Sequence, residues 1–507
     1  MSSFASFVRL HEPPLLFKFG QAVEDPRDGL TLFGPLDEGR PYGVRAGVIG
    51  TAAGRARFRK WVERIQSPIS NDPPRIGRPM FPGFESAFQI PWNTTPAIEL
   101  DVDTAELGRR VLVADPHQRV YQTVDLFSSA IVDAIRTEET KPDMWFVIIP
   151  DEVHQYCRPK SVVARDLRVP ADEQMNPDSA RRMSTEPFLL SEETKAAIPY
   201  QYEVNFHNQL KGRLLEHNAP TQIIRESTVA HRDFLNTAGH PRRRLDELQS
   251  AIAWNLCSTA FYKCGGRPWK IGSIRPGVCY IGLVFKREDN SRDPCSACCA
   301  AQMFLDSGDG VVFKGNVGPW YVPDTGDYHL SADAAGDLVR NALKAYRAKH
   351  NGDAPRELFI HGKVRFEERE WTGFREAAGK ITNLVGVRIR PESDLRFYRK
   401  GEQPILRGLA YIRDERTAYL MTKGFTPRLQ TYPGREVPRP LLVDVCKGDV
   451  PIETVLNDLM ALTKLNYNAC IFADGEPVTL RFADAIGEIL TSGPFANIPP
   501  LPFKHYI

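Results

Sequence analysis

The chain has 507 residues, of which 42% are hydrophobic and 25% are charged, and its formal net charge is +2. This length predicts several domains, because one hydrophobic core rarely serves more than about 300 residues. The near-neutral balance excludes a protein that coats nucleic acid through overall charge, so a nucleic-acid role needs a local basic channel. Residues 1–14 lack the pattern of a secretory signal and no apolar run is long enough for a membrane span, so we expect a cytoplasmic protein.

Apolar runs and helical periodicities alternate along the chain. We expect strands over 42–49, 144–149, 278–285, 358–361 and 409–412, and helices over 53–65, 124–136, 205–215, 245–262, 332–350 and 452–465. This alternation is typical of the α/β class. The strand-rich stretch 278–317, with Gly308, Asp309 and Gly310 at a predicted hairpin tip, indicates antiparallel pairing, so we expect a mixed sheet in the second half.

Two other regions differ from this regular pattern. Residues 263–269 are rich in turn formers and mark the main predicted domain boundary. Residues 158–200 are polar and aperiodic, which is typical of a surface excursion or a loop that faces a partner. The nine cysteines are expected to be reduced core residues, and Cys295, Cys298 and Cys299 lack the second ligand pair of a zinc site.

Four polar side chains in the first half form a candidate anion pocket. His207 and Lys211 lie four residues apart on one face of a predicted helix. Such a pair alone is more often a solvated helix face. Gln222 near the start of a short strand and Lys263 at the end of a helix favour the anion pocket, because phosphate binding needs donors that converge from several elements.

The order His, Lys, Gln, Lys-x-Gly-Gly-x-Pro-Trp resembles the MID-domain motif that holds the guide 5′ phosphate in Argonaute proteins. The resemblance implies that this phosphate is bound by His207, Lys211, Gln222 and Lys263, with His207 where many prokaryotic members carry Tyr. It continues through 29–35, 78–84, 278–285, 358–364, 462–468 and 475–483. It implies an α/β protein with an N-terminal segment or linker (1–40), a Rossmann-like MID domain (41–265) and an RNase H-like PIWI domain with a mixed sheet (266–507).

The same resemblance implies a magnesium ion in the MID pocket. In many prokaryotic Argonautes the terminal carboxylate, here that of Ile507, binds a Mg²⁺ that the guide phosphates share. Oxygen ligands of this kind suit Mg²⁺, which keeps several waters. Thr259 stands where some members carry a second ligand, Gln, and is the weaker candidate.

The PIWI-like half lacks acids at the positions that matter for cleavage. RNase H-like cutting needs two metal ions about 3.5–4 Å apart that carboxylates hold. The resemblance places the catalytic positions at Val284, Lys363 and Asn466, none of which is acidic. Asp306 and Asp309 are interpreted as turn residues. We therefore expect a protein that does not cut, and a nuclease with rearranged ligands is the alternative.

The chain thus resembles a short prokaryotic Argonaute. The resemblance implies a sensor that carries guide RNA and recognises complementary single-stranded DNA in prokaryotic defence. It implies a heterodimer with an APAZ effector, TIR-APAZ being favoured and sirtuin-like-APAZ the alternative, which depletes NAD on target binding, with higher oligomers as a further possibility. A stand-alone RNA-binding module is the other alternative. Candidates for nucleic-acid backbone contacts are Arg225, Arg232, Lys270, Lys314 and Arg365, and the run 242–244 is either a groove wall or a solvated helix start.

Overall fold

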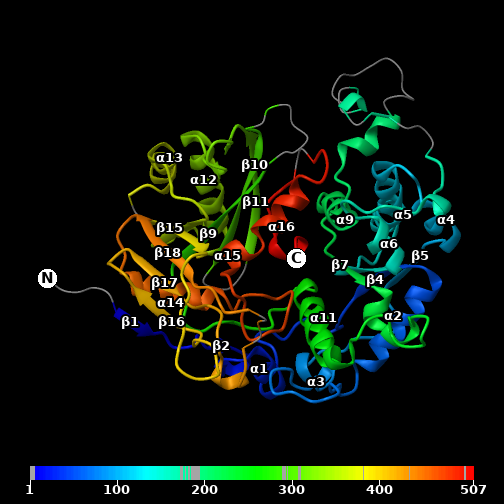
Figure 1. The fold of residues 1–507 in the computed structure, drawn as a ribbon, viewed down its shortest axis with the longest axis horizontal. Coiled ribbons are helices and arrows are strands. Elements are labelled where there is room, and N and C mark those ends of the chain that lie inside the picture. Colours follow the sequence, from blue (N-terminus) through cyan, green and yellow to red (C-terminus); the bar gives the residue numbers. More distant parts are fainter. Residues whose placement is uncertain are drawn as a thin grey trace.

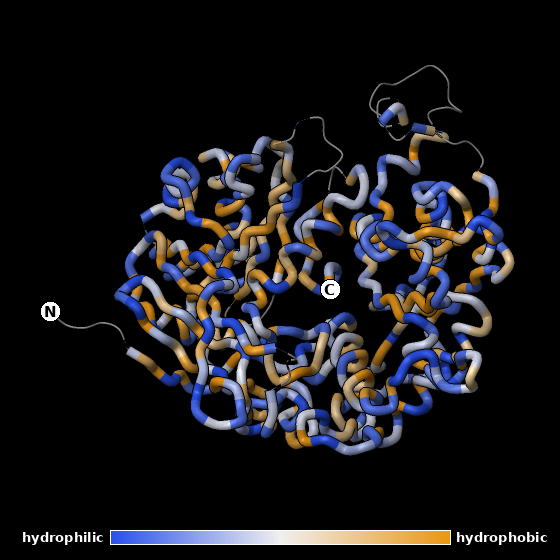
Figure 2. Tube along the Cα trace, viewed as in Figure 1, coloured by the Kyte–Doolittle hydropathy of each residue, from blue (hydrophilic) through white to orange (hydrophobic). Residues whose placement is uncertain are grey.

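The computed structural model describes residues 6–507 except 172–174, 177, 181–182, 184–194, 288–292, 294, 306–309, 381, 433, 435 and 496–497. Figure 1 shows two lobes, each built around one large β-sheet. In Figure 2 the apolar segments concentrate on the strands of both sheets, with polar segments on the surrounding helices and loops. None of the described helices is long and apolar enough to cross a membrane.

The first lobe contains a four-stranded parallel sheet. Its order is β5 (Ile98–Asp101), β4 (Ala46–Gly50), β6 (Met144–Ile149) and β7 (Thr221–Arg225). Every residue of β4 and β6 is buried, because helices cover both faces of this sheet. Phe146 packs in the cluster that contains Phe58 of α2 (Ala52–Arg64). Its neighbour Val147 packs with α5 (Pro116–Thr137) and α9 (Phe206–Leu215).

The second lobe contains a ten-stranded mixed sheet. Its order is β1 (Ser6–Arg9), β16 (Leu409–Ile412), β17 (Thr417–Leu420), β18 (Leu441–Lys447), β15 (Asn383–Pro391), β14 (Glu357–Gly362), β9 (Val278–Arg287), β10 (Ala297–Leu305), β11 (Gly310–Gly318) and β19 (Leu501–Pro502). β14 is parallel to β9 and β15, whereas β10 is antiparallel to β9 and β11. The α/β class and the mixed sheet of the second half are therefore confirmed.

Helices cover both faces of the ten-stranded sheet (Figure 1). α12 (Ala332–Lys349) and α13 (Glu368–Ala378) pack on the face that carries Ile281 and Ile360. α14 (Ile452–Leu462), α15 (Val478–Arg481) and α16 (Ala483–Leu490) pack on the face that carries Tyr280 and Phe359. Because successive side chains of a strand point to opposite faces of the sheet, β9 and β14 contribute residues to both hydrophobic cores.

Most predicted elements agree with the structure to within a few residues. The predicted bounds of β6 and β16 match at both ends. α5 begins eight residues earlier than predicted, at Pro116, where Asp115 caps it by accepting a hydrogen bond from the Gln118 main chain. The predicted hairpin corresponds to β10 and β11, but Asp306, Gly308 and Asp309 lie outside the described residues. Cys298 and Cys299 are buried on opposite faces of β10, so they cannot share a metal ion.

Residues 1–40, predicted to be an N-terminal segment or linker, contribute strands to the fold. β1 pairs with β16, and β2 (Leu15–Leu16) pairs with β3 (Ala22–Val23) and with β8 (Lys270–Ile271). Strands this short carry no detectable periodicity in the sequence.

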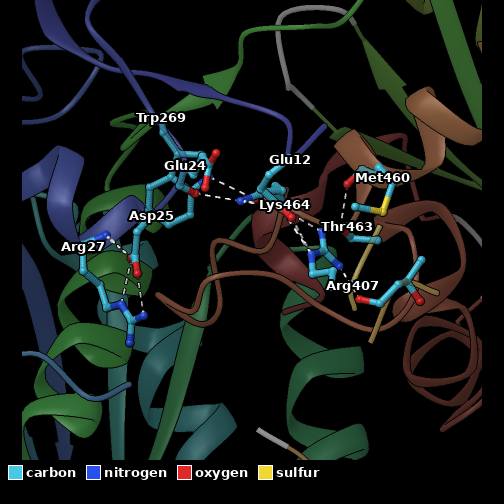
Figure 3. Close-up of polar contacts among 10 residues, drawn as sticks. Glu12, Glu24, Asp25, Arg27, Trp269, Arg407, Met460, Thr463 and Lys464 are labelled. Atoms are coloured by element: carbon cyan, nitrogen blue, oxygen red, sulfur yellow. Dashed lines mark hydrogen bonds and ion pairs between the residues drawn. The ribbon is translucent and has the colours of Figure 1, made fainter. Parts of the chain in front are cut away.

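A buried charge cluster also ties this segment to the second lobe (Figure 3). Glu12 accepts hydrogen bonds from Arg407 at 3.0 Å and forms an ion pair with Lys464 at 2.8 Å. Lys464 also donates to the Glu24 main-chain oxygen, at 2.7 Å, and Arg407 donates to the Thr463 hydroxyl, at 2.7 Å. We call Glu12, Arg407 and Lys464 the paired cluster.

Candidate functional site

Four segments meet between the two lobes at the place where His207, Lys211, Gln222 and Lys263 were predicted to converge. They are α9, the start of β7, the end of α11 (Gln249–Lys263) and the chain segment 503–507, whose end Figure 1 shows between the lobes. Asn205 caps α9 and so fixes the first turn, from which His207 and Lys211 follow one turn apart. Gly265, with φ of 94°, turns the chain away just after Lys263.

The two lysines converge on one oxygen. Lys211 and Lys263 are 4% and 0% exposed, and the ammonium group of each donates to the Ile507 main-chain oxygen at 2.5 Å. Lys263 also donates to the Thr221 main-chain oxygen at 2.7 Å and to Oε1 of Gln222 at 2.9 Å. Across the described part of the chain, neither ammonium group has an Asp or Glu side chain as a partner. We call Lys211 and Lys263 the unpaired lysines.

Burial changes the acidity of both groups. It lowers the pKa of Lys211 to about 7, because the ammonium form is separated from water. Burial also lowers the pKa of Lys263 well below its usual value, and the charges of Lys211 and Lys504 lower it further. A bound anion would oppose all of these effects, so the site is suited electrostatically to accept negative charge.

His207 lies in the first turn of α9, one turn before Lys211, and its side chain faces a cavity. Its Nδ1 lies 3.0 Å from Oδ1 of Asn208, and its exposed ring lines a cavity of about 470 Å³ between β6, α6 (Asp151–Tyr156) and β7. Loss of solvation within the cavity is the largest effect that lowers the pKa of His207, to about 4, and the charge of Lys211 is the next largest. Arg225 and His154 line this cavity too, with Nη1 of Arg225 3.0 Å from Nδ1 of His154. A cavity of this size beside an anion site can hold a planar ring such as a nucleobase.

The residues proposed for magnesium offer only one oxygen, and both lysines already donate to it. Ile507 contributes the oxygen that both lysines contact, whereas the Thr259 hydroxyl donates to Asn255 and lies 3.3 Å from the Tyr467 main-chain oxygen. Within the described ranges, no group of three or more His, Cys, Asp or Glu side chains could hold a metal. These residues therefore do not build a metal site themselves, but the single Ile507 oxygen fits an ion whose other ligands are phosphates and water.

The remaining basic candidates are separate from the unpaired lysines. Arg232 pairs with Asp246 at 2.9 Å, and Arg365 pairs with Asp444 at 2.8 Å. The Lys314 ammonium group donates to the Phe495 main-chain oxygen, and Lys270 lies in β8 opposite Leu16. Of the five candidates, only Arg225 lines the cavity that His207 lines.

The positions predicted for degenerate catalytic acids are only partly brought together. The parallel register pairs His361 with Gly282, and Lys363 and Val284 each lie two residues further on. Val284 is buried, and Lys363 forms an ion pair with Asp484 of α16 at 3.0 Å.

Asn466, the third position that the resemblance implies, does not lie in this pair. It donates to Asp474 at 2.6 Å in the loop after α14, and Asp484 is the residue that α16 presents to Lys363. The structure thus brings Lys363 together with Asp484, a residue that the sequence prediction did not include. The only signal for it in the sequence is an acidic residue next to Ala483.

The sheet face beside these positions is filled by protein. A Cβ atom on Gly282 would meet the Thr479 main-chain oxygen at 1.8 Å, so α15 lies directly against β9. His361, which is 1% exposed, has its Nδ1 2.9 Å from the Thr479 hydroxyl. Gln302 donates to the Thr479 main-chain oxygen at 3.1 Å. The described contacts here are therefore those of a packed core.

Comparison with solved structures identifies the fold, although no protein-family model and no curated protein matches the chain. Argonaute from Clostridium butyricum, solved with a guide DNA and a 19-mer target DNA, aligns with 97% of this chain and 54% of its own, at 14% identity and a TM-score of 0.60. Drosophila Piwi aligns with 99% of this chain and 56% of its own, at 15% identity and a TM-score of 0.60. Argonaute from A. aeolicus aligns with 98% and 54%, at 12% identity and a TM-score of 0.53.

These similarities establish an Argonaute-like fold of the MID–PIWI type over nearly the whole chain. The chain spans about half the length of the solved neighbours. At this level of identity the likeness concerns the fold, and any function must be argued from the site itself.

Proposed function

We propose that the chain binds the 5′ phosphate of a short guide strand at Lys211 and Lys263 and recognises a complementary target through base pairing. The observation that carries this proposal is the convergence of two buried ammonium groups, from two different helices, on one oxygen without an acidic side chain. A phosphate monoester supplies the missing negative charge and several acceptor oxygens. Gln222, already 2.9 Å from Lys263, holds that ammonium group in place.

The energetics favour a phosphorylated strand over one that ends in a hydroxyl group. Hydrogen bonds between charged partners contribute about 1.5–3 kcal/mol each when the geometry is fixed. Both lysines are fixed, since each is enclosed by its own helix and by the segment 503–507. A 5′ hydroxyl offers no charge, so it would leave both buried ammonium groups without compensation.

The cavity beside His207 provides room for the first nucleotide. Its imidazole ring can stack on a nucleobase, and Arg225 can contact the strand from the opposite wall. Phosphate contacts position a strand without reading its sequence, so specificity in this proposal comes from pairing between guide and target. Magnesium, when bound, would neutralise charge between neighbouring phosphates, with the Ile507 oxygen as the one protein ligand.

We further propose that the chain does not cut the target. The resemblance implies that Lys363, just after β14, stands at the position of a catalytic acid, and its ammonium group already pairs with Asp484. An ammonium group at such a position would repel a metal that needs a carboxylate. A nuclease with rearranged ligands would cleave a paired target in the presence of Mg²⁺ or Mn²⁺. Absence of cleavage at either metal, with binding intact, is the expected result.

The partner and the biological output rest on the sequence resemblance. We propose a guide RNA, a single-stranded DNA target and a cytoplasmic heterodimer with an APAZ effector, in which target binding activates NAD depletion as a prokaryotic defence and higher oligomers form. A TIR-APAZ partner is favoured over a sirtuin-like-APAZ partner. Co-expression with each effector type, followed by NAD measurement after addition of guide and target, distinguishes the two. A stand-alone RNA-binding module would activate neither.

The central test compares two guides of the same sequence, one with a 5′ phosphate and one with a 5′ hydroxyl. The wild-type chain should bind the phosphorylated guide more tightly. The Lys211→Ala and Lys263→Ala double variant should bind both guides equally. A wild-type chain without preference would contradict the assignment of the pocket.

A further inference from the structure

The His505 side chain is buried near the unpaired lysines. It is 3% exposed, and neither Nδ1 nor Nε2 of its ring has a hydrogen-bond partner among the residues that the structure describes. Buried polar groups in folded proteins nearly always have one, so this ring is a candidate for contact with a bound group. His505 belongs to none of the motifs predicted from the sequence.

The neighbours of His505 connect it to the pocket. Ile507, two residues on, supplies the oxygen that Lys211 and Lys263 contact, and Lys504 donates to the Lys263 main-chain oxygen at 3.0 Å. The His505 ring therefore belongs to the segment that contacts both unpaired lysines, and the charges of Lys504, Lys263 and Lys211 act on it.

An imidazole ring carries at least one N–H group that can donate a hydrogen bond. The ligand that accepts from this N–H and is also attracted by the nearby ammonium groups is an anion with several oxygens. We propose that His505 is a third direct ligand of the phosphate monoester that Lys211 and Lys263 bind. This inference rests on the proposed function of that pocket and extends it to a residue near the end of the sequence.

Two other buried groups show what a purely structural role would look like. The ring of His361 is also buried, but its Nδ1 lies 2.9 Å from the Thr479 hydroxyl, so the core supplies its partner. The Tyr506 hydroxyl is buried and has no hydrogen-bond partner within the described ranges, and burial raises its pKa. Only His505 among these three combines a missing partner with the field of the unpaired lysines.

A matched pair of substitutions isolates the hydrogen bond. His505→Gln keeps an N–H donor, whereas His505→Met has a similar length and no donor. The readout is the ratio of dissociation constants for 5′-hydroxyl and 5′-phosphate guides of one sequence, measured in EDTA so that metal ions do not contribute. We expect the Met variant to lower this ratio by about tenfold to one-hundredfold relative to wild type, and the Gln variant to keep most of it. Binding of the 5′-hydroxyl guide should not change.

The controls separate this inference from the proposed function. Tyr506→Phe removes the neighbouring unpartnered hydroxyl and should leave the ratio unchanged. An unchanged ratio in His505→Met, together with a lost preference in the double lysine variant, would overturn the role of His505 and leave the pocket intact. If wild type itself had no preference for the phosphate, both claims would fall.

A second measurement covers the case in which the His505 variants do not fold. The wild-type chain has 11 histidines, so ¹⁵N labelling of histidine gives a tractable set of ring signals. Addition of a 5′-phosphorylated dinucleotide should shift the ring nitrogens of His505, and the 5′-hydroxyl dinucleotide should not. Identical spectra with the two dinucleotides would overturn the proposal.

Discussion

The molecule buries positive charge in two places, and it treats them differently. In the paired cluster, Glu12 neutralises Arg407 and Lys464 within the protein (Figure 3). Between the lobes, Lys211 and Lys263 are as deeply buried, and their hydrogen bonds to described residues go to the Ile507 main-chain oxygen and, for Lys263, also to Thr221 and Gln222. Buried ammonium groups without an acidic side chain as partner are expected where a ligand completes the site. The paired cluster attaches the N-terminal segment to the second lobe, whereas we propose that the unpaired lysines bind an anion.

The largest effect is expected when an acidic side chain is introduced beside the unpaired lysines. Gln222→Glu places a carboxylate 2.9 Å from the Lys263 ammonium group with little change in shape. It should weaken binding of a 5′-phosphorylated guide by at least about a hundredfold, because the new charge occupies Lys263 and repels the phosphate. Equilibrium binding of fluorescent guides measures this. Gln222→Leu, which removes the amide without adding charge, should weaken binding by about tenfold or less.

The opposite change removes a charged partner from the paired cluster. Lys464→Met removes one partner of Glu12 from a buried position and should lower the free energy of unfolding by about 3 kcal/mol. Denaturant unfolding of the guide-free protein measures this. The Glu12→Gln and Lys464→Met double variant should lose less than the sum of the two single losses, because no unpaired carboxylate is left. Strict additivity would show that the pair contributes nothing as a pair.

The same type of substitution should have the opposite sign at the unpaired site. Lys211→Met replaces a buried ammonium group that has no acidic partner, so the guide-free protein should gain about 1 kcal/mol in the free energy of unfolding. Stability thus rises where guide affinity falls, which is typical of a residue kept for binding. A loss of stability like that of Lys464→Met would instead mean that Lys211 serves the fold.

The smallest expected effect is the contribution of Glu12 to the pH dependence of stability. Burial alone would raise the pKa of Glu12, but the charges of Arg407 and Lys464 outweigh burial and hold it below the usual value of 4.5. The carboxylate therefore stabilises the fold at pH values above 4.5, and this contribution is lost as the pH falls through the lower, folded value. Melting temperatures between pH 6 and pH 3 should fall less steeply in Glu12→Gln than in wild type. Parallel curves would contradict this assignment.

The sequence was sufficient for the regular elements of the fold and insufficient for its edges. β6 and α9 follow from continuous apolar runs and from a four-residue spacing, which local physics determines. β1 and β2 pair with strands hundreds of residues away, and two- or four-residue strands carry no such pattern. Their place in the fold, and that of Glu12, is determined by tertiary contacts alone.

The candidate site divides in the same way. Lys211 and Lys263 could be selected beforehand because each belongs to a motif with a known chemical use. His505 could not, because a single histidine carries no spacing, and only the fold shows that its ring is buried among lysine charges. Asp484 was missed for a related reason, since its pairing with Lys363 joins residues 121 positions apart.

The most direct test of the central claim is to purify the chain from its host and determine the 5′ ends of any short nucleic acid that accompanies it. We expect short strands that carry a 5′ phosphate, and their loss in the Lys211→Ala and Lys263→Ala double variant. Short strands with 5′ hydroxyl ends, or strands retained equally by the double variant, would contradict it, because the unpaired lysines would then have no role in holding a guide.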